Sequence, residues 1–327
     1  MMAPDVRKIA KYPFVLVLCF TLLLTIDTRE KNSKRYGDIY AKIQNIKSPF
    51  TVQDFPYIPD TVHFFGGRVP LEVFGVWEDI DEWIKFFTSA KNRWRIVLYL
   101  GLLKEYSPII DSIFKEGGIP LDMKYVGVGE SGFNSNAVSS KGATGWWQFI
   151  RSTAIRNGLK INSNIDERRQ LELATRASCR EIKNLYQEFK KTFNEEESWW
   201  FALASYNAGS GRIWKSIKAD GEKSYFRLSS LPRETERYIP CVIALKLILE
   251  NPERYGFVEG ITYSGPKMIV IEKYFPKFTP WKTLLSELRN SGYNISLKEL
   301  TRANTHIKNK RGIPKGNFLL RIPDRRK

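Results

Sequence analysis

The spacing of apolar residues predicts helices through the middle of the chain. Apolar positions three and four residues apart indicate helices over Asp79–Thr88 and Lys91–Gly117, and Pro108 is expected to kink or divide the second of them. The segment 119–128 (IPLDMKYVGV) predicts a short buried helix with Pro120 in its first turn. The fold is therefore expected to be mainly helical.

Further helices are predicted beyond residue 150. Ser152 and Thr153 are typical N-terminal caps and indicate a short helix. The same periodicity predicts one long helix over Asn164–Phe193, a second over Glu195–Ala208 and a third over Thr235–Glu250.

The N-terminal region has a different pattern. Basic residues precede Pro13–Ile26, a run that is apolar except for two threonines and one cysteine. Its length suits the apolar part of a signal peptide and is short for a membrane span, so residues 1–26 predict either a signal peptide or a retained N-terminal membrane anchor. Cys19 leaves lipidation open. Residues 27–78 read as a linker or extended arm, with short strands expected near 62–65 and 73–76.

The C-terminal region, residues 258–327, changes character again. Strands are predicted at Met268–Ile271 and Phe318–Ile322, and helices between them at Trp281–Arg289 and Ser296–Ala303. This order predicts a small α+β module after the helical region.

Composition narrows the class of partner without choosing one. The 327 residues are 43% hydrophobic and carry a net charge of +17, which indicates an anionic partner such as nucleic acid, a membrane surface or a cell-wall polymer. The two histidines, His63 and His306, form no cluster with cysteines, so no metal site or cofactor is predicted. Cys179 and Cys241 fit either a disulfide or two free buried thiols.

Glu130 is the first candidate for catalysis. It falls at the C-terminal end of the helix predicted over 119–128. The negative end of the helix dipole and the apolar neighbours both disfavour a charged carboxylate there. A carboxyl group that stays neutral near neutral pH suits a general acid. A lone glutamate at a helix end could equally serve as a cap or form a salt bridge. The neighbouring residues therefore decide between a structural and a catalytic role.

Those surroundings favour a sugar site. Gly142 and Gly145 bracket a tight turn where backbone can approach a ligand closely, and Trp146, Trp147 and Gln148 follow. A carboxyl group, an amide and flat aromatic rings together suit a polyol with apolar faces.

Three blocks of sequence resemble the signature of the SLT-type lytic transglycosylases, which cleave peptidoglycan. The blocks are 130–149 (ESGFNSNAVSSKGATGWWQF), 202–209 (ALASYNAG) and 234–240 (ETERYIP). Within that family the chain most resembles the membrane-bound lytic murein transglycosylase D group, in which a helical lead-in precedes the catalytic glutamate and LysM-type modules follow. The resemblance implies a lysozyme-like domain over 79–257 and a LysM-like wall-binding module over 258–327.

The resemblance also implies a mechanism without water. Glu130 would protonate the oxygen of the β-1,4 bond between N-acetylmuramic acid and N-acetylglucosamine, while the muramoyl N-acetyl carbonyl stabilises the cationic centre. The Glu130 carboxylate would then remove the proton from the C6 hydroxyl, whose oxygen closes on C1 to leave a 1,6-anhydromuramoyl end. The residues carried over as substrate-binding, which position the N-acetyl group and orient Glu130, are Ser131, Gln148, Tyr206, Asn207 and Tyr238.

The chain departs from the family pattern at two places. Ile150 and Arg151 stand where Met and Pro usually follow the Gln-Phe pair, and Trp146 stands where Leu is usual. These changes concern the groove wall, and hence chain-length preference more than chemistry. The C-terminal sequences 296–307 and 319–323 are similar to the second half of a LysM module, but its usual first-half G-D-T-L is missing, so the module is degenerate.

Two other functions remain open. A hydrolytic muramidase would use water and a second carboxylate, for which Asp166, Glu167 and Glu172 are candidates, although charges at a helix start also explain them. A wall-binding protein with an inactive site is the other alternative. A nucleic-acid binder would explain the charge but neither the export signal nor the three blocks. We therefore expect export to the cell envelope (periplasm), with peptidoglycan strands as partner.

Overall fold

The computed structural model describes residues 58–257 and 267–326. This part is mainly helical, as predicted, with three small two-stranded sheets. Residues 1–57, which hold the predicted signal peptide or anchor and most of the predicted linker, lie outside the described residues, as do 258–266. Within the described ranges, no helix combines the length and apolar character that a membrane span requires.

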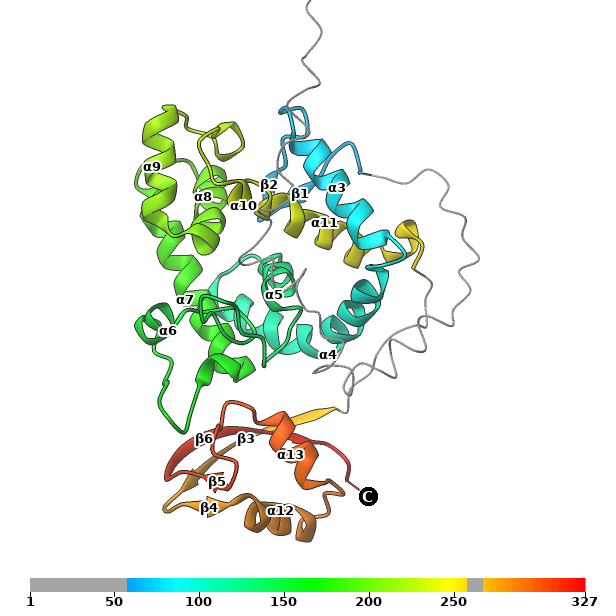
Figure 1. Ribbon diagram of the computed structural model, residues 1–327, viewed down its shortest axis with the longest axis vertical. Coiled ribbons are helices and arrows are strands. Elements are labelled where there is room, and N and C mark those ends of the chain that lie inside the picture. The colour runs from blue at the N-terminus through cyan, green and yellow to red at the C-terminus, as the bar shows by residue number, and fades with distance from the viewer. Residues whose placement is uncertain (1–57, 258–266, 327) are drawn as a thin grey trace, which may run out of the picture.

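A hairpin and two helices open the described part (Figure 1). β1 (His63–Phe64) pairs with β2 (Gly67–Arg68). The strand predicted at 73–76 is wrong, because α3 (Val76–Thr88) begins directly after Gly75, whose φ of 90° favours glycine. α4 (Arg93–Gly117) is one helix that continues through Pro108, so the proline does not divide it.

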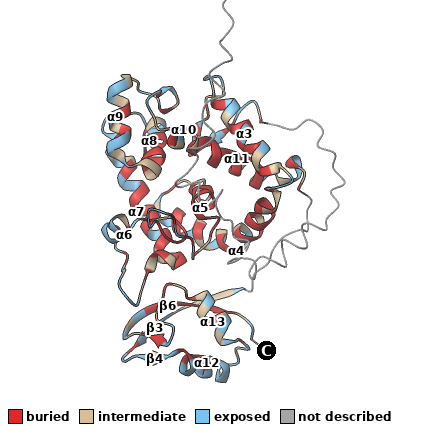
Figure 2. Ribbon diagram, viewed as in Figure 1, coloured by how far each residue is buried: buried red, intermediate tan, exposed pale blue. Residues whose placement is uncertain are grey.

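α5 (Met123–Ser131) lies at the centre of the helical region (Figure 1) and is buried along its length (Figure 2). It begins later than predicted and ends at Gly132, which adopts the left-handed conformation of a helix C-cap. Glu130 therefore falls in the last turn. α6 (Arg151–Arg156) begins after Ile150, and Ser152 and Thr153, expected as caps, lie inside it.

The single helix predicted over Asn164–Phe193 is wrong. The structure has a 3-10 turn, η2 (Glu167–Arg169), followed by α7 (Leu171–Lys190). The Asp166 side chain accepts a hydrogen bond from the Arg168 amide, and the Gln170 side chain accepts one from the Leu173 amide. Each side chain caps a separate helical start, so the helix breaks between them.

The remaining helices of this region follow α7 closely. α8 (Glu195–Ala208) has the predicted bounds, but α9 (Ser210–Asp220) starts straight after Gly209 and was not predicted. The helix predicted over Thr235–Glu250 is split at Arg237. The other elements are η3 (Tyr225–Arg227), α10 (Arg233–Glu236), α11 (Tyr238–Glu250) and η4 (Pro252–Tyr255).

The C-terminal module keeps the predicted strand–helix–helix–strand order and has two further short strands that were not predicted. β3 (Met268–Phe275) pairs antiparallel with β6 (Gly316–Pro323), and β4 (Thr279–Pro280) pairs with β5 (Gly312–Ile313). Between them lie α12 (Trp281–Asn290) and α13 (Leu297–Ala303), which starts with a capping box of Ser296 and Glu299.

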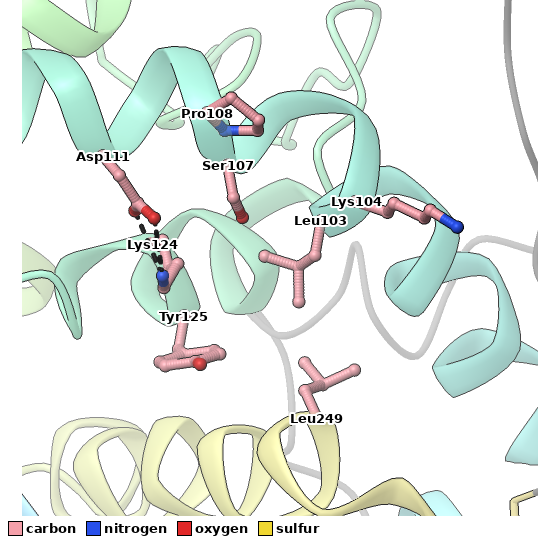
Figure 3. Close-up of a pocket in the computed structure, with 8 residues that line it drawn as sticks. All are labelled: Leu103, Lys104, Ser107, Pro108, Asp111, Lys124, Tyr125 and Leu249. Atoms are coloured by element: carbon pink, nitrogen blue, oxygen red, sulfur yellow. Dashed lines mark hydrogen bonds and ion pairs between the residues drawn. The ribbon is translucent and has the colours of Figure 1, made fainter. Parts of the chain in front are cut away.

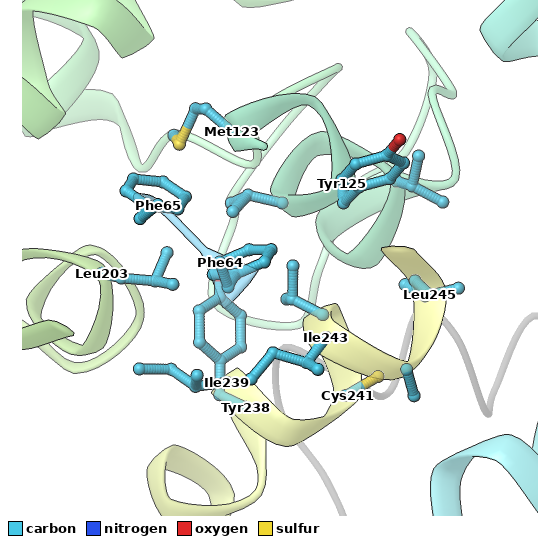
Figure 4. Packing of buried hydrophobic residues seen from close by; sticks show 14 of the residues in the cluster. Phe64, Phe65, Met123, Tyr125, Leu203, Tyr238, Ile239, Cys241, Ile243 and Leu245 are labelled. Carbon is cyan, nitrogen blue, oxygen red and sulfur yellow. The ribbon is translucent and has the colours of Figure 1, made fainter. Parts of the chain in front are cut away.

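Two hydrophobic cores correspond to the two regions. The larger runs from Ile58 to Phe257 and the smaller from Phe275 to Ile322. In the larger core, Tyr238, Ile239 and Cys241 of α11 pack near Phe64 and Leu203 (Figure 4). The tryptophans of α8 and α9, whose role the sequence leaves open between core and sugar stacking, stack on core rings: Trp199 on Tyr186, Trp200 on Phe64 and Trp214 on Phe189.

Both described cysteines are free and buried. Burial raises the pKa of the Cys179 thiol to about 12 and that of Cys241 well above its ordinary value. Of the two alternatives, the structure has free thiols rather than a disulfide.

Candidate active site

Glu130 sits at the end of a buried helix with little room around it. Its side chain belongs to the last turn of α5 and only 4% of the residue is exposed. The helix can approach its neighbours because of glycine: a Cβ at Gly127 would lie 2.6 Å from the Phe133 ring. Burial raises the pKa of Glu130 to about 7, although a hydrogen bond from Tyr238 opposes this shift. The group can therefore hold a proton near neutral pH.

Tyr238 is the partner of this carboxyl group. It is the first residue of α11, and its Oη donates to Glu130 Oε1 at 2.6 Å. Only 1% of Tyr238 is exposed, so packing fixes its ring as well as this hydrogen bond.

Gln148 lies on the loop that follows α5. This loop has only isolated bridges, between Val138 and Thr144 and between Thr144 and Phe149. Gln148 adopts a φ of 49°, which is unusual for a residue with a side chain, and its Nε2 donates to the Gly145 carbonyl at 2.9 Å. The loop therefore holds this amide in a strained but bonded position.

Two hydroxyl groups anchor the tryptophan pair of the loop. Ser131 Oγ donates to the Trp146 carbonyl at 2.8 Å, and Tyr206 Oη donates to the Trp147 carbonyl at 3.0 Å. Burial, followed by the charge of Glu130, raises the pKa of Tyr206 well above its ordinary value. Ser131 and Tyr206 thus bind the backbone next to Gln148.

The expectation that Trp146 and Trp147 offer flat faces to a sugar is wrong. Both are buried, Trp147 completely. Trp146 packs edge-on against Tyr106 at 5.0 Å between ring centroids, and Trp147 packs against Phe114 at 5.5 Å. The two rings therefore anchor the loop to the hydrophobic core.

The side-chain amide of Asn207 has a hydrogen-bond donor without an acceptor among the described residues. Its Oδ1 accepts a hydrogen bond from Thr235 Oγ1 at 3.2 Å, whereas its buried Nδ2 has no partner among the described residues. A buried amide without a partner is costly, so a role for it outside the free protein is expected.

Residues 116–228 match the family model described as Transglycosylase SLT domain. The helical region contains an SLT domain. This confirms the predicted family of the domain. The matched range includes five of the six predicted site residues, and Tyr238 lies beyond it.

Curated relatives align with part of the chain. Over 145 residues the chain is 37% identical to membrane-bound lytic murein transglycosylase D of Escherichia coli (strain K12), covering 43% of this chain and 31% of that protein. Over 180 residues it is 27% identical to membrane-bound lytic murein transglycosylase F of Shewanella frigidimarina, covering 54% of this chain and 35% of that protein. The chain thus spans about a third of the length of these relatives.

Solved structures include two similar chains. Lytic transglycosylase Slt from Pseudomonas aeruginosa is 19% identical with a TM-score of 0.38, covering 48% of this chain and 25% of that one. The 70 kDa soluble lytic transglycosylase from Escherichia coli is 19% identical with a TM-score of 0.38, covering 49% of this chain and 26% of that one.

Glu234 is a neighbour of the site to which the sequence assigned no role, although it begins the third motif block, 234–240. Its charge is among the causes that raise the pKa of Glu130, although burial is the main one. Glu234 lies in α10 and precedes Tyr238 by four residues. The signal available was its place in the same motif block as Tyr238.

The other carboxylates considered for a second catalytic group already have partners. Asp166 forms an ion pair with Arg168 at 2.8 Å, and Glu172 forms one with Arg321 at 2.6 Å. Glu167 accepts a hydrogen bond from the Lys160 amide. Within the described residues no group of three His, Cys, Asp or Glu side chains could hold a metal ion.

A cavity elsewhere on the helical region is separate from Glu130. It has a volume of about 370 Å³ and is lined by residues of α4, the first turn of α5 and the end of α11 (Figure 3). Lys124 and Asp111 form an ion pair there at 3.0 Å. Because Lys124 and Glu130 lie at opposite ends of α5, this cavity does not contain the candidate acid.

Proposed function

We propose that this protein is a peptidoglycan lytic transglycosylase that leaves a 1,6-anhydromuramoyl end. The observation that carries the proposal is the buried carboxyl group of Glu130 within an SLT domain, with a pKa of about 7 and a hydroxyl donor on one oxygen. The relatives named as lytic murein transglycosylases support the substrate class.

In the first step Glu130 acts as general acid. It gives its proton to the glycosidic oxygen between N-acetylmuramic acid and N-acetylglucosamine, and the C1–O bond breaks. The carbonyl oxygen of the substrate's own N-acetyl group stabilises the positive charge at C1, so a second carboxylate is not needed. Asp166 and Glu172 are already held in ion pairs, which agrees with a mechanism that uses only one carboxyl group.

In the second step Glu130 acts as general base. Its carboxylate is stabilised by the hydrogen bond from Tyr238 Oη. It removes the proton from the C6 hydroxyl, and the C6 oxygen forms a bond to C1. This closes the anhydro ring and returns Glu130 to its protonated form. The proton that Glu130 gives in the first step is thus replaced in the second, and no water is consumed.

The remaining site residues position the substrate. The unused Nδ2 donor of Asn207 and the amide of Gln148 are the groups we assign to the N-acetyl group and the sugar hydroxyls. Ser131 and Tyr206 act through the loop backbone that they hold, at Trp146 and Trp147.

The domain organisation and location belong to the same proposal. We assign residues 79–257 to catalysis, residues 258–327 to a degenerate LysM-like module and residues 1–26 to export or anchoring at the cell envelope. The names of the relatives as membrane-bound enzymes support the location.

Mass spectrometry of muropeptides released from purified peptidoglycan tests this function. We expect anhydromuropeptides from the wild type and none from Glu130→Gln. Glu167→Gln is the active control, because among the described residues the Glu167 carboxylate accepts a hydrogen bond only from the nearby Lys160 backbone amide. Reducing ends, heavier by one water, would instead identify a hydrolytic muramidase. No release by the wild type would favour the wall-binding alternative.

A further inference from the structure

A buried ion pair joins the C-terminal module to the SLT domain. Arg321 of β6 places Nη1 2.6 Å from Glu172 Oε1, at the start of α7, and both residues are buried. The other oxygen of Glu172 accepts a hydrogen bond at 2.6 Å from Gln170, the residue that caps α7. Breaking such a pair from one side leaves a buried charge, so the contact resists separation.

Backbone hydrogen bonds reinforce the same junction. The Asp166 amide donates to the His306 carbonyl at 2.8 Å, and the Lys308 amide donates to the Asn164 carbonyl at 2.8 Å. Between these bonds Ile165 and Ile307 form an antiparallel bridge. The module thus pairs with the segment that precedes η2 through one isolated bridge and two flanking backbone hydrogen bonds.

η2, which follows that segment directly, in turn holds the loop that carries Gln148. Arg168 Nη1 donates to the carbonyls of Gly142 and Phe149, each at 3.0 Å. The Trp146 indole donates to the Arg169 carbonyl at 2.8 Å. Every one of these bonds ends on the loop between α5 and α6.

The module also reaches the loop directly. Thr305 Oγ1 donates to Ser135 Oγ at 3.2 Å. The Arg321 guanidinium lies over the Tyr106 ring, 5.5 Å from its centroid, and Tyr106 is the ring that packs against Trp146. Two routes, one through hydrogen bonds and one through aromatic packing, therefore connect the module to the loop.

We propose that the C-terminal module braces the active-site loop 135–149, with Arg321 as the positioning residue that locks the two together. A loop with only isolated bridges and a left-handed Gln148 needs support from its surroundings to keep that conformation. A binding module that only tethers the enzyme to its substrate would need neither a buried ion pair nor a backbone bridge to the catalytic region. The effect on turnover rests on the proposed function, whereas the effect on loop order does not.

Amide hydrogen exchange on the full-length chain tests the brace. We expect Arg321→Glu, which places a negative charge beside Glu172, to speed exchange about tenfold or more in peptides covering 135–149 and 162–170. Peptides from α8 and α11 should stay protected. The matched control is Arg325→Glu, because Arg325 pairs with Glu299 inside the module and its side chain is 53% exposed.

Unchanged exchange at 135–149 in Arg321→Glu would overturn the proposal, whether or not the junction itself opens. If that variant unfolds throughout, Arg321→Lys and Thr305→Val replace it. These should speed exchange severalfold in the same two peptides only, and full protection of 135–149 in both would also overturn the proposal. Anhydromuropeptide release should fall with loop protection in the Arg321 variants and stay normal in Arg325→Glu. Loss of the exchange effect and loss of wild-type activity are separate results, so the two proposals fail separately.

Discussion

Tyr238 and Glu130 are 108 residues apart in sequence, and the tyrosine hydroxyl donates to the glutamate carboxyl group at 2.6 Å. The two residues lie at the meeting point of α5 and α11. The hydrogen bond favours the charged carboxylate, and burial favours the neutral acid. The balance leaves a pKa of about 7, which suits a group that must give up a proton and take one back in a single cycle.

Tyr238→Phe should change this balance in a defined direction. Loss of the donor removes the contribution that lowers the pKa of Glu130, so the pKa rises. Activity that requires the protonated acid falls as pH rises through the pKa, and this fall should therefore move to higher pH. We also expect a rate about 10 to 100 times lower, because the second step loses stabilisation of the carboxylate. The measurement is the pH profile of anhydromuropeptide release.

The control for this variant comes from the other end of the same two helices. Tyr125 Oη donates to Glu250 Oε1 at 3.0 Å, which is the same kind of pair away from the site. Tyr125→Phe should leave the pH profile in place. A profile that does not move in Tyr238→Phe would contradict the assigned role of the hydroxyl.

Burial of Glu130 should also cost stability at high pH. The pKa is about 7 in the folded chain against an ordinary value of 4.5. Below about pH 4.5 Glu130 is protonated in both the folded and the unfolded chain, so its burial contributes its full stabilisation. As pH rises from about 4.5 through about 7 the unfolded chain ionises first, and the free energy of unfolding falls until this contribution is lost. This difference corresponds to about 3 kcal/mol. Glu130→Gln stays neutral, so relative to wild type it should gain about that much unfolding free energy between about pH 4 and pH 9.

Urea unfolding of both proteins at several pH values measures this effect. Comparing the two variants at each pH cancels the titration of every other group. A constant difference between them across the range would show that Glu130 is not held neutral by burial.

The sequence grouped the residues around Glu130 better than it predicted the bounds of the surrounding helices. The three motif blocks contain Glu130, Gln148, Tyr206 and Tyr238, and the helix predicted before Glu130 exists. The helix over Asn164–Phe193 failed because its pattern of apolar residues is continuous, whereas the break depends on caps by Asp166 and Gln170. The caps bond to Arg168 and Glu172, each two residues away. These two residues are held in turn by distant partners, the Phe149 carbonyl and Arg321, that no local pattern contains.

The role of the tryptophan pair was misjudged for a related reason. An aromatic residue next to an amide fits a sugar site and a core equally well, and only the three-dimensional packing decides. Here Tyr106 and Phe114 of α4 cover Trp146 and Trp147. The sequence could not indicate this, because α4 precedes the loop by many residues and its aromatic positions serve several contacts.

Gly145 should be the least replaceable glycine of the loop. A Cβ there would overlap the carbonyl oxygen of Arg168, which is backbone and cannot move alone, and φ is 81°. Gly142 has a φ of 75° but open space around its Cβ position. Gly142→Ala should therefore cost only the backbone strain, about 1 kcal/mol, whereas Gly145→Ala should cost about 3 kcal/mol or more. Urea unfolding measures both, and equal losses would rule out the close approach as the cause.

Asn207 should affect the substrate more than the fold. Its Nδ2 is buried without a partner among the described residues, so the free protein gains nothing from that donor. Asn207→Ala should lower kcat/KM by about 10 to 100 times while the unfolding free energy changes by less than about 1 kcal/mol. Ser205→Ala is the control, because Ser205 Oγ on the same helix is also buried without a partner but is assigned no substrate contact. Steady-state kinetics and urea unfolding separate the two effects. Equal kinetics in both variants, or a large loss of stability in Asn207→Ala, would mean that the amide serves α8 and not the sugar.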